Sequence, residues 1–510
     1  MKFFRNMLTV GFWTLMSRIL GMAREVLLYT LIGVGPVLDA FLVAFRLPNM
    51  FRRFFAEGAF NTAFVPMYAK RLESQAEADR FASDAFSGLA FVLLILTALA
   101  MIFMPALVWA IAGGFAGDAR FDLAVGYGRV MFPYIFLISL GALLSGALNA
   151  RGRFGIAAAA PVFLNVLVII ALFAAWVFDK DSTVFLVWSI PLAGCVQLSL
   201  LWWGASTSGL RISLRRPSFT PNMRHLLKVA MPAALANGVV QINLLVGTIV
   251  ASFFPGAVSW LYGADRLYQL PLGVVGIAIG IVLLPELSKR IQSGDTEGAC
   301  LAFAQANEIS FALSFPAAVA LFVIPLPIIS ALFEHGATAR SDAVAMAQAC
   351  AIYALGLPAF ILQKVLQPLY FAREDTKTPF RFALYSMVVN AALAIGLMNL
   401  LGWVAPAIAT TVSSWVMVGL LANGIRPFGN MGEVSAEGRH RLIRIALAAL
   451  GMGAGLWVLD ALCENFIDST LLRILYAPAL AIAGILLYAL FARLSGAISL
   501  SDLKRALKNN

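Results

Sequence analysis

Long runs of apolar residues recur along the whole chain and alternate with short polar segments. Fourteen runs reach the roughly 20 residues that an α-helix needs to cross a bilayer. They cover approximately residues 8–33, 37–68, 85–112, 123–149, 156–178, 182–207, 225–253, 257–286, 303–333, 342–371, 379–400, 403–425, 442–462 and 470–492. An open strand edge cannot satisfy its backbone groups in lipid, whereas a helix can. The pattern therefore predicts an all-α polytopic membrane protein with 14 transmembrane helices.

Composition agrees with this interpretation. Of the 510 residues, 61% are hydrophobic and 12% are charged, and the mean hydropathy is +0.87. Soluble domains carry about 25% charged residues, so a soluble enzyme or nucleic-acid-binding protein is excluded. The first run resembles a signal peptide, but Arg18 interrupts it, and we expect it to remain as an uncleaved helix.

The positive charge is distributed asymmetrically. If the N-terminus is cytoplasmic, 25 of the 37 Lys and Arg residues lie in or beside cytoplasmic segments, four lie in or beside the opposite connections, and eight lie within helices. This bias is the one expected for cytoplasmic N- and C-termini. Arg211, Arg215 and Arg216 form a basic cluster in one cytoplasmic segment that can contact anionic lipid.

Two parts of the chain resemble each other at a spacing of about 220 residues. The matching pairs are Arg46 and Arg266, Pro66 and Pro285, Lys70-Arg71 and Lys289-Arg290, and Ala150-Arg151 and Ala372-Arg373. Six predicted helices separate the members of each pair, so the repeats are parallel, as in transporters built from two lobes around a central site. We predict an N-terminal lobe at 1–210, a C-terminal lobe at 211–430, and two extra helices with a cytoplasmic tail at 431–510.

The predicted helices contain more charged residues than lipid tolerates easily. The cations are Arg18, Arg24, Arg46, Arg52, Arg53, Arg129, Arg266 and Lys364, and the carboxylates are Glu25, Asp39, Glu57 and Asp265. Each charge costs roughly 3 kcal/mol at the centre of a bilayer. Helical periodicity places Arg18, Arg24 and Glu25 on one face of predicted helix 1, Asp39, Arg46, Arg53 and Glu57 on one face of helix 2, and Arg266 on a polar face of helix 8. Pro48 and Pro271 interrupt helices 2 and 8 beside them. Such faces are expected to line a wet cavity.

Two explanations of these charges remain open. Arg53 and Glu57 lie four residues apart and can neutralise each other, Asp265 can hold Arg266, and Arg129 and Lys364 can extend to an interface. Even so, the cations outnumber the carboxylates by four. An anionic ligand is the simplest partner for this surplus, and the planar guanidinium group suits phosphate or carboxylate oxygens.

Three stretches of the sequence resemble one family. SRILGMAREVL (17–27), FRLPNMFRRFFAEGAFNTAFVP (45–66) and ADRLYQLPLGVVGIAIGIVLLP (264–285) are similar to the MurJ (MviN) lipid II flippase family. The resemblance implies a bacterial inner-membrane flippase of the multidrug/oligosaccharidyl-lipid/polysaccharide exporter superfamily. Such a protein moves lipid II, the undecaprenyl-diphosphate-linked disaccharide-pentapeptide of peptidoglycan synthesis, from the cytoplasmic to the periplasmic leaflet. It also implies that helices 13 and 14 form a groove for the lipid tail.

The resemblance also implies site residues. The cavity arginines of the family, expected to bind the diphosphate, match Arg18, Arg24, Arg52 and Arg266, and its acids on helix 2 match Asp39 and Glu57. The shared helix faces add supporting cavity residues, which are Glu25, Arg46, Asn49, Arg53, Ser259, Asp265 and Gln269. Some relatives have Glu at the position of Gln269, so a carboxylate role is not supported there.

No cofactor is expected. Helix 7 lacks the acid that a sodium site reported in some family members requires, and the four cysteines and three histidines are scattered. The membrane potential is the expected driving force, since one charge crossing 100 mV gains roughly 2.3 kcal/mol. We expect a monomer that contacts lipid II, the phospholipid bilayer and the cell-wall synthesis machinery, and no nucleic acid.

Other functions remain as alternatives. One is a flippase for a different polyprenyl-diphosphate-linked oligosaccharide, which would need the same cations. Another is an ion-coupled exporter of small solutes, although a cavity for cationic drugs would be acidic. A membrane enzyme would need clustered carboxylates or a metal, and no such constellation is evident in the predicted outer loops.

Overall fold

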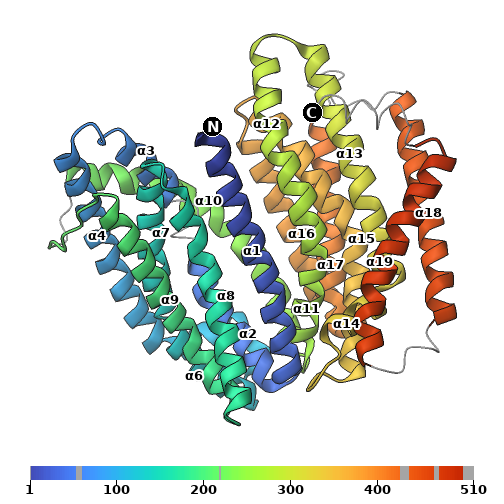
Figure 1. Cartoon of the computed structure of the whole chain (residues 1–510), viewed down its shortest axis with the longest axis horizontal. Coiled ribbons are helices and arrows are strands. Elements are labelled where there is room, and N and C mark those ends of the chain that lie inside the picture. The colour runs from blue at the N-terminus through green and yellow to red at the C-terminus, as the bar shows by residue number, and fades with distance from the viewer. Residues whose placement is uncertain (1, 53–59, 217–219, 426–435, 464–469, 498–510) are drawn as a thin grey trace. The chain divides into compact units, whose positions relative to one another are not determined.

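The computed structural model describes residues 2–52, 60–216, 220–425, 436–463 and 470–497, most of them helical (Figure 1). Internal contacts divide the chain into two compact units, residues 1–259 and 260–510. The boundary lies inside one helix, α11, after Ser259. The lobes predicted above were defined by the internal sequence repeat, whereas these units are defined by internal contacts. The predicted lobes therefore stay a prediction.

The helices that begin in the first unit are α1 (Lys2–Leu31), α2 (Pro36–Arg52), α3 (Phe60–Ala69), α4 (Gln75–Ile102), α5 (Met104–Ile111), η2 (Gly113–Phe115), α6 (Ala119–Met131), α7 (Tyr134–Ala150), α8 (Phe154–Val177), α9 (Ser182–Thr207), α10 (Pro221–Ser252) and α11 (Ala257–Pro271). Those of the second unit are η3 (Leu272–Gly276), α12 (Ile277–Gln292), α13 (Thr296–Val323), α14 (Pro325–Phe333), α15 (Arg340–Phe371), α16 (Lys377–Leu401), η4 (Gly402–Val404), α17 (Ala405–Gly424), α18 (Ala436–Cys463) and α19 (Thr470–Leu494).

Each of the fourteen predicted ranges falls on one helix or on consecutive helices of the described chain. The range 85–112 is divided between α4 and α5, and the range 303–333 between α13 and α14. Prolines stand at the start of the second helix in both cases. Because proline lacks an amide donor and clashes with the preceding turn, a helix ends before it and a new one begins.

Nine helical stretches in the described residues are long and apolar enough to span a membrane. Together they include ten of the fourteen predicted helices, and they establish a multi-pass membrane protein. The other four predicted ranges correspond to α1, to α2 and α3, to α10, and to α11 with α12. α2, α3, α11 and α12 have 17, 10, 15 and 16 residues, each fewer than the roughly 20 that a spanning helix needs. α1 carries one of the charged faces described above, which lowers its hydropathy. The count of 14 spans stays a prediction.

In the first unit, α1 packs along α8, and α8 and α7 both pack against α9 (Figure 1). The extended segment 210–216 then runs over α4. Its alternate backbone N–H groups, at Arg211, Ser213 and Arg215, donate to Asp79, Ser83 and Ser87 at 3.3, 3.1 and 3.0 Å. Two residues of extended chain advance about 6.6 Å and four residues of helix about 6.0 Å, so the two periodicities match.

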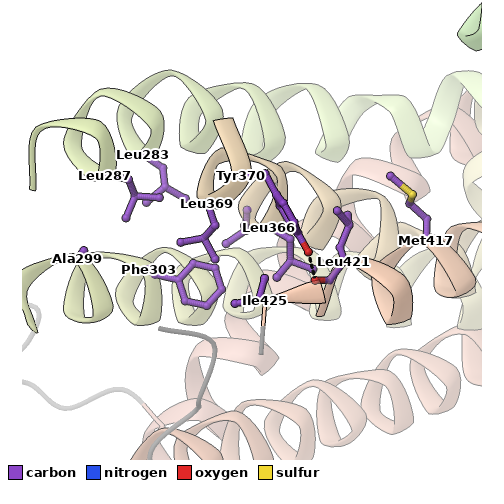
Figure 2. Packing of buried hydrophobic residues seen from close by; sticks show 11 residues of the cluster. Leu283, Leu287, Ala299, Phe303, Leu366, Leu369, Tyr370, Met417, Leu421 and Ile425 are labelled. Carbon is purple, nitrogen blue, oxygen red and sulfur yellow. Dashed lines mark hydrogen bonds between the residues drawn. The ribbon is translucent and has the colours of Figure 1, made fainter. Parts of the chain in front are cut away.

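In the second unit, a buried apolar cluster joins α12, α13, α15 and α17 (Figure 2). Its members include Leu287, Phe303, Leu369 and Tyr370. The Tyr370 hydroxyl, drawn in Figure 2, donates to the Leu421 carbonyl at 2.6 Å. This bond satisfies the one polar atom that the tyrosine brings into the cluster.

The last two helices, α18 and α19, pack against each other and against α13 and α14 (Figure 1). Met452, Leu456 and Leu480 are buried in this contact. Glu334, at the end of α14, forms ion pairs of 2.8 Å with Arg340 and with Arg473 of α19. Burial opposes ionisation of this carboxyl, but hydrogen bonds from Ser330 and Arg340 and the two cations hold its pKa below the ordinary value.

A close approach of two backbones requires glycine at residue 114. The Gly114 amide donates to the Ser252 hydroxyl at 3.0 Å, and an added Cβ would lie 2.6 Å from the Phe253 Cα. No side-chain rotation relieves a clash with backbone. We therefore expect Gly114→Ala to destabilise the protein by about 1–3 kcal/mol, measured as a lower unfolding temperature in detergent.

Gly113→Ala is the matched control, because an added Cβ there meets nothing within 4 Å. Equal unfolding temperatures for the two variants would show that η2 does not approach α10 as closely as described.

Candidate functional site

Arg24 on α1 has two polar partners within the first unit. Its guanidinium group pairs with Glu25 and donates to Asn165 Oδ1 on α8 at 3.1 Å. Asn165 in turn donates to the Ser17 carbonyl on α1 at 2.9 Å. The Arg24 and Glu25 side chains are only 13% and 3% exposed. Asn165 therefore joins α1 to α8 and restricts the orientation of Arg24.

Asn165 is not among the predicted site residues. A signal was present, because Asn165 is the only polar side chain in the 24 residues of α8. A lone amide in an otherwise apolar membrane helix is expected to bond to a neighbouring helix.

Arg18 lies two turns before Arg24 on α1 and has a different environment. It is exposed, and it lies at a cavity of about 460 Å³ that α1, α7 and α8 enclose. Ser17 and Thr14 of the same helix also line this cavity. The structure thus gives Arg18 access to a ligand.

Asp39 on α2 is completely buried, and its carboxylate bonds residues at the start of α11. It accepts hydrogen bonds from the Gly256 amide at 2.8 Å, the Ser259 amide at 3.0 Å and the Ser259 hydroxyl at 2.6 Å. The first amides of a helix have no partner within the helix, and a carboxylate there also interacts favourably with the helix dipole. Asp39 and Ser259, both predicted as cavity support, are thus brought together, and they act on each other.

Two residues outside the predicted set support this arrangement. Arg120, only 3% exposed, has its guanidinium 3.6 Å from Asp39 and bonds Asp118 at 2.6 Å. The Tyr29 hydroxyl donates to the Ser259 carbonyl at 2.6 Å. Arg120 lies in the connection between predicted ranges 85–112 and 123–149, outside the predicted helices. The available signal was Ala119-Arg120, which matches Ala339-Arg340 at the repeat spacing of 220 residues.

The other predicted residues of the first unit lie on the second half of α2. Arg46 and Asn49 are partly buried, and the Asn49 side chain donates to the Phe45 carbonyl at 3.1 Å. Arg52 is the last residue of the helix. Arg53 and Glu57 lie outside the described residues, so their suggested ion pair stays a prediction.

In the second unit, the predicted residues form a cluster on α11. Arg266 lies 3.8 Å from Asp265, and its guanidinium lies over the Tyr262 ring at 4.2 Å. Gln269 donates to the same Asp265 carboxylate. The Asp265–Arg266 ion pair, considered above as an alternative explanation of this charge, is thus present but long. The cation–π contact with Tyr262 gives Arg266 a further partner. A single π-helical turn, η3, follows Pro271, where the sequence predicted an interruption.

Among the described residues, no group of three His, Cys, Asp or Glu side chains could hold a metal ion. Arg129 is exposed and donates to the Met101 carbonyl at 3.3 Å. Of the described helix arginines, Arg24 and Arg129 thus donate hydrogen bonds and Arg266 has an ion pair, whereas Arg18 is exposed at the cavity. Guanidinium groups of this kind can bind an anion.

Comparison with known proteins identifies the family. The family model for the lipid II flippase MurJ matches residues 28–477. The chain belongs to the MurJ lipid II flippase family. It is 45% identical to a probable lipid II flippase MurJ of Rhizobium tropici, over 88% of this chain and 86% of the relative. It is 43% identical to the one of Rhizobium meliloti (strain 1021), over 100% and 97%.

Solved structures agree with this assignment. A lipid II flippase MurJ in an inward closed conformation superimposes with a TM-score of 0.81 and 26% identity, over 95% of this chain and 98% of that one. An inward-facing multidrug transporter of the MATE family gives a TM-score of 0.70 at 17% identity, over 82% and 96%, which shows the same fold. The family is one of flippases, so the expectation of a transporter instead of an enzyme is confirmed. Its bacterial relatives imply the cytoplasmic membrane.

The Asp39 contacts lead to a stability prediction. Asp39→Ala leaves two amides and a hydroxyl at the start of α11 without their acceptor, and each buried polar group left unpaired costs about 1–3 kcal/mol. We expect a marked fall in the unfolding temperature of the purified protein, and a smaller fall for Asp39→Asn, which retains one acceptor oxygen.

Asp122→Ala provides the control, since this aspartate is exposed on α6. If Asp39→Ala unfolds at the same temperature as Asp122→Ala, Asp39 does not hold the start of α11.

Proposed function

We propose that this protein translocates lipid II from the cytoplasmic to the periplasmic leaflet by alternating access. The observation that carries the proposal is 43% identity to a probable lipid II flippase across the whole chain. The substrate named for the relatives, a polyprenyl diphosphate bearing sugars and a peptide, also fits the excess of arginine within the helices.

The proposed topology has 14 transmembrane helices with both termini cytoplasmic. Two parallel six-helix repeats are followed by α18 and α19, which would form a groove for the polyprenyl tail. The helices at all fourteen predicted ranges and the asymmetric distribution of Lys and Arg support this topology. The charge bias also depends on the helix count, because one extra or missing span would reverse the side of every later connection.

The diphosphate would bind to Arg18, Arg24, Arg52 and Arg266. Contacts of Arg24 with Asn165 and of Arg266 with Tyr262 support this role, because they orient the guanidinium groups before the substrate arrives. Donors that are already oriented lose less conformational entropy on binding.

No covalent chemistry is needed for translocation. An inside-negative potential would drive the anionic headgroup outward and draw the empty cationic cavity back toward the cytoplasm. The π turn after Pro271 supports such movement, since a π turn or proline is where a helix bends. We propose that the protein acts as a monomer, in contact with the bilayer and with the cell-wall synthesis machinery.

The arginine assignment leads to a binding prediction. Arg24→Ala and Arg266→Ala each remove a charge-assisted contact to phosphate, worth about 1.5–3 kcal/mol. We expect each variant to bind lipid II at least tenfold more weakly and to fail to replace the wild-type protein in a depletion strain. Native mass spectrometry of the purified protein with lipid II measures the binding.

Arg381→Ala, at an exposed arginine on α16, should bind lipid II normally. The anion-cavity proposal fails if Arg24→Ala and Arg266→Ala both bind lipid II and support growth as the wild type does.

The role of the potential can be tested in proteoliposomes. A potassium gradient with valinomycin imposes 100 mV across the vesicle membrane, which is worth up to roughly 2.3 kcal/mol per charge moved. We expect initial lipid II flipping toward the positive side to accelerate several-fold compared with vesicles at equal potassium. A flipping rate that does not change with potential would exclude this coupling.

A further inference from the structure

The cavity beside Arg18 has a polar lining at one end and an apolar wall. Its volume of about 460 Å³ lies within the range of small-molecule sites. Thr14 and Arg18 of α1 and Ser145 and Asn149 of α7 contribute polar side chains, whereas Phe154 and Ala158 belong to the apolar wall on α8. All three helices belong to the first unit.

Much of the hydrogen-bonding capacity at this cavity is unused. Within the described part of the chain, the side chains of Arg18, Ser145 and Asn149 make no hydrogen bond or ion pair. Thr14 donates its proton to the Val10 carbonyl at 2.8 Å, which leaves its oxygen free to accept. Arg18 and Asn149 are exposed at the cavity and Ser145 is partly buried there, so their donors and acceptors are accessible to a polar ligand.

The lining indicates the chemical class of this ligand. One guanidinium group matches one phosphate, since it can donate two parallel hydrogen bonds. The Ser145 hydroxyl and the Asn149 amide can both donate and accept, and the Thr14 hydroxyl can accept. These groups match neutral hydroxyl and amide groups better than further anions. The apolar wall would face the C–H groups of the same ligand. A sugar that carries an amide and is joined to a phosphate has all of these features.

The position of the cavity fits the entry of a substrate headgroup. Asn149 lies in the last turn of α7, and Phe154 begins α8, so the cavity starts at the turn between these helices. In the proposed topology this turn is cytoplasmic. Arg24 lies six residues beyond Arg18, about 9 Å further along α1, so an extended headgroup could contact both arginines.

We infer that this cavity is a subsite for the amide-bearing sugar next to the diphosphate of the substrate, with Arg18 at its phosphate end. The inference rests on the proposed function and assigns Ser145, Asn149 and Thr14 to sugar recognition. A phospholipid headgroup such as glycerol phosphate shares the combination of phosphate and hydroxyls. The experiment must therefore distinguish a sugar-bearing diphosphate lipid from a phospholipid as the ligand of this cavity.

The double variant Ser145→Ala/Asn149→Ala tests the subsite. Native mass spectrometry of the full-length protein would compare binding of lipid II, undecaprenyl diphosphate without sugars, and phosphatidylglycerol. We expect the wild type to prefer lipid II over undecaprenyl diphosphate. The double variant should bind lipid II about tenfold more weakly and bind undecaprenyl diphosphate within twofold of the wild type.

Two further variants control for damage to the fold. Ser74→Ala/Asn423→Ala removes the same groups from exposed positions elsewhere and should bind all lipids normally. Ala158→Phe fills the cavity and should reduce the preference for lipid II, whereas Ala392→Phe, at an exposed position on α16, should not.

The outcomes separate this inference from the proposed function. An unchanged preference for lipid II in the double variant, or an equal loss of both undecaprenyl lipids, would overturn the sugar subsite while the flippase function stands. A loss of phosphatidylglycerol binding alone would assign the cavity to phospholipid and also overturn it. A wild-type protein that binds neither undecaprenyl lipid would contradict the proposed function itself.

Discussion

The cost of leaving a polar group without a partner in lipid governs this structure. Arg24 and Arg266 are each held by specific neighbours, and these neighbours differ in chemistry. Arg24 has a carboxylate on its own helix and an amide on α8, and Arg266 has a carboxylate and an aromatic ring on α11. Because each partner has a fixed place on a helix, meeting the electrostatic requirement also fixes the orientation of the guanidinium group. In the proposed function, the same contacts that make these charges tolerable would also orient them for a phosphate.

The same requirement applies to backbone amides where helices end or are interrupted. At the start of α11 the acceptor is Asp39 on another helix, and along segment 210–216 the acceptors are three side chains spaced by four residues on α4. In both places side chains replace water as the partner of the backbone. The guanidinium group of Arg120, which is also buried, lies near Asp39 and partly balances the charge of its carboxylate. A buried polar network of this kind favours one arrangement of the helices, because the loss of one member leaves the others unpaired.

The sequence was sufficient to locate the helices and the family, because both depend on local patterns. Apolar runs gave all fourteen helical ranges, although proline at 105 and 325 divides two of them, as the rule for helix starts could have indicated. The partners of the arginines were harder to predict. Asn165 could have been found as the single polar residue of α8. Arg120 lies outside the predicted spans, so its charge contributed only to the prediction of which connections are cytoplasmic. The Tyr29 bond to the Ser259 carbonyl joins residues 230 positions apart and depends on packing that no local pattern encodes.

A flippase must release what it binds, and in the proposed binding site the environments of Arg18 and Arg24 would meet this need in different ways. Arg24 shares its charge with Glu25, which leaves less of its electrostatic interaction for the substrate. Arg18 has no hydrogen bond or ion pair within the described residues, and it remains exposed at the cavity. If all four arginines resembled Arg18, the diphosphate would bind tightly and leave slowly, and transport requires binding weak enough for release. If all resembled Arg24, little would attract the substrate from the cytoplasmic leaflet. A combination of partnered and available arginines therefore suits a carrier better than a uniform set of either kind.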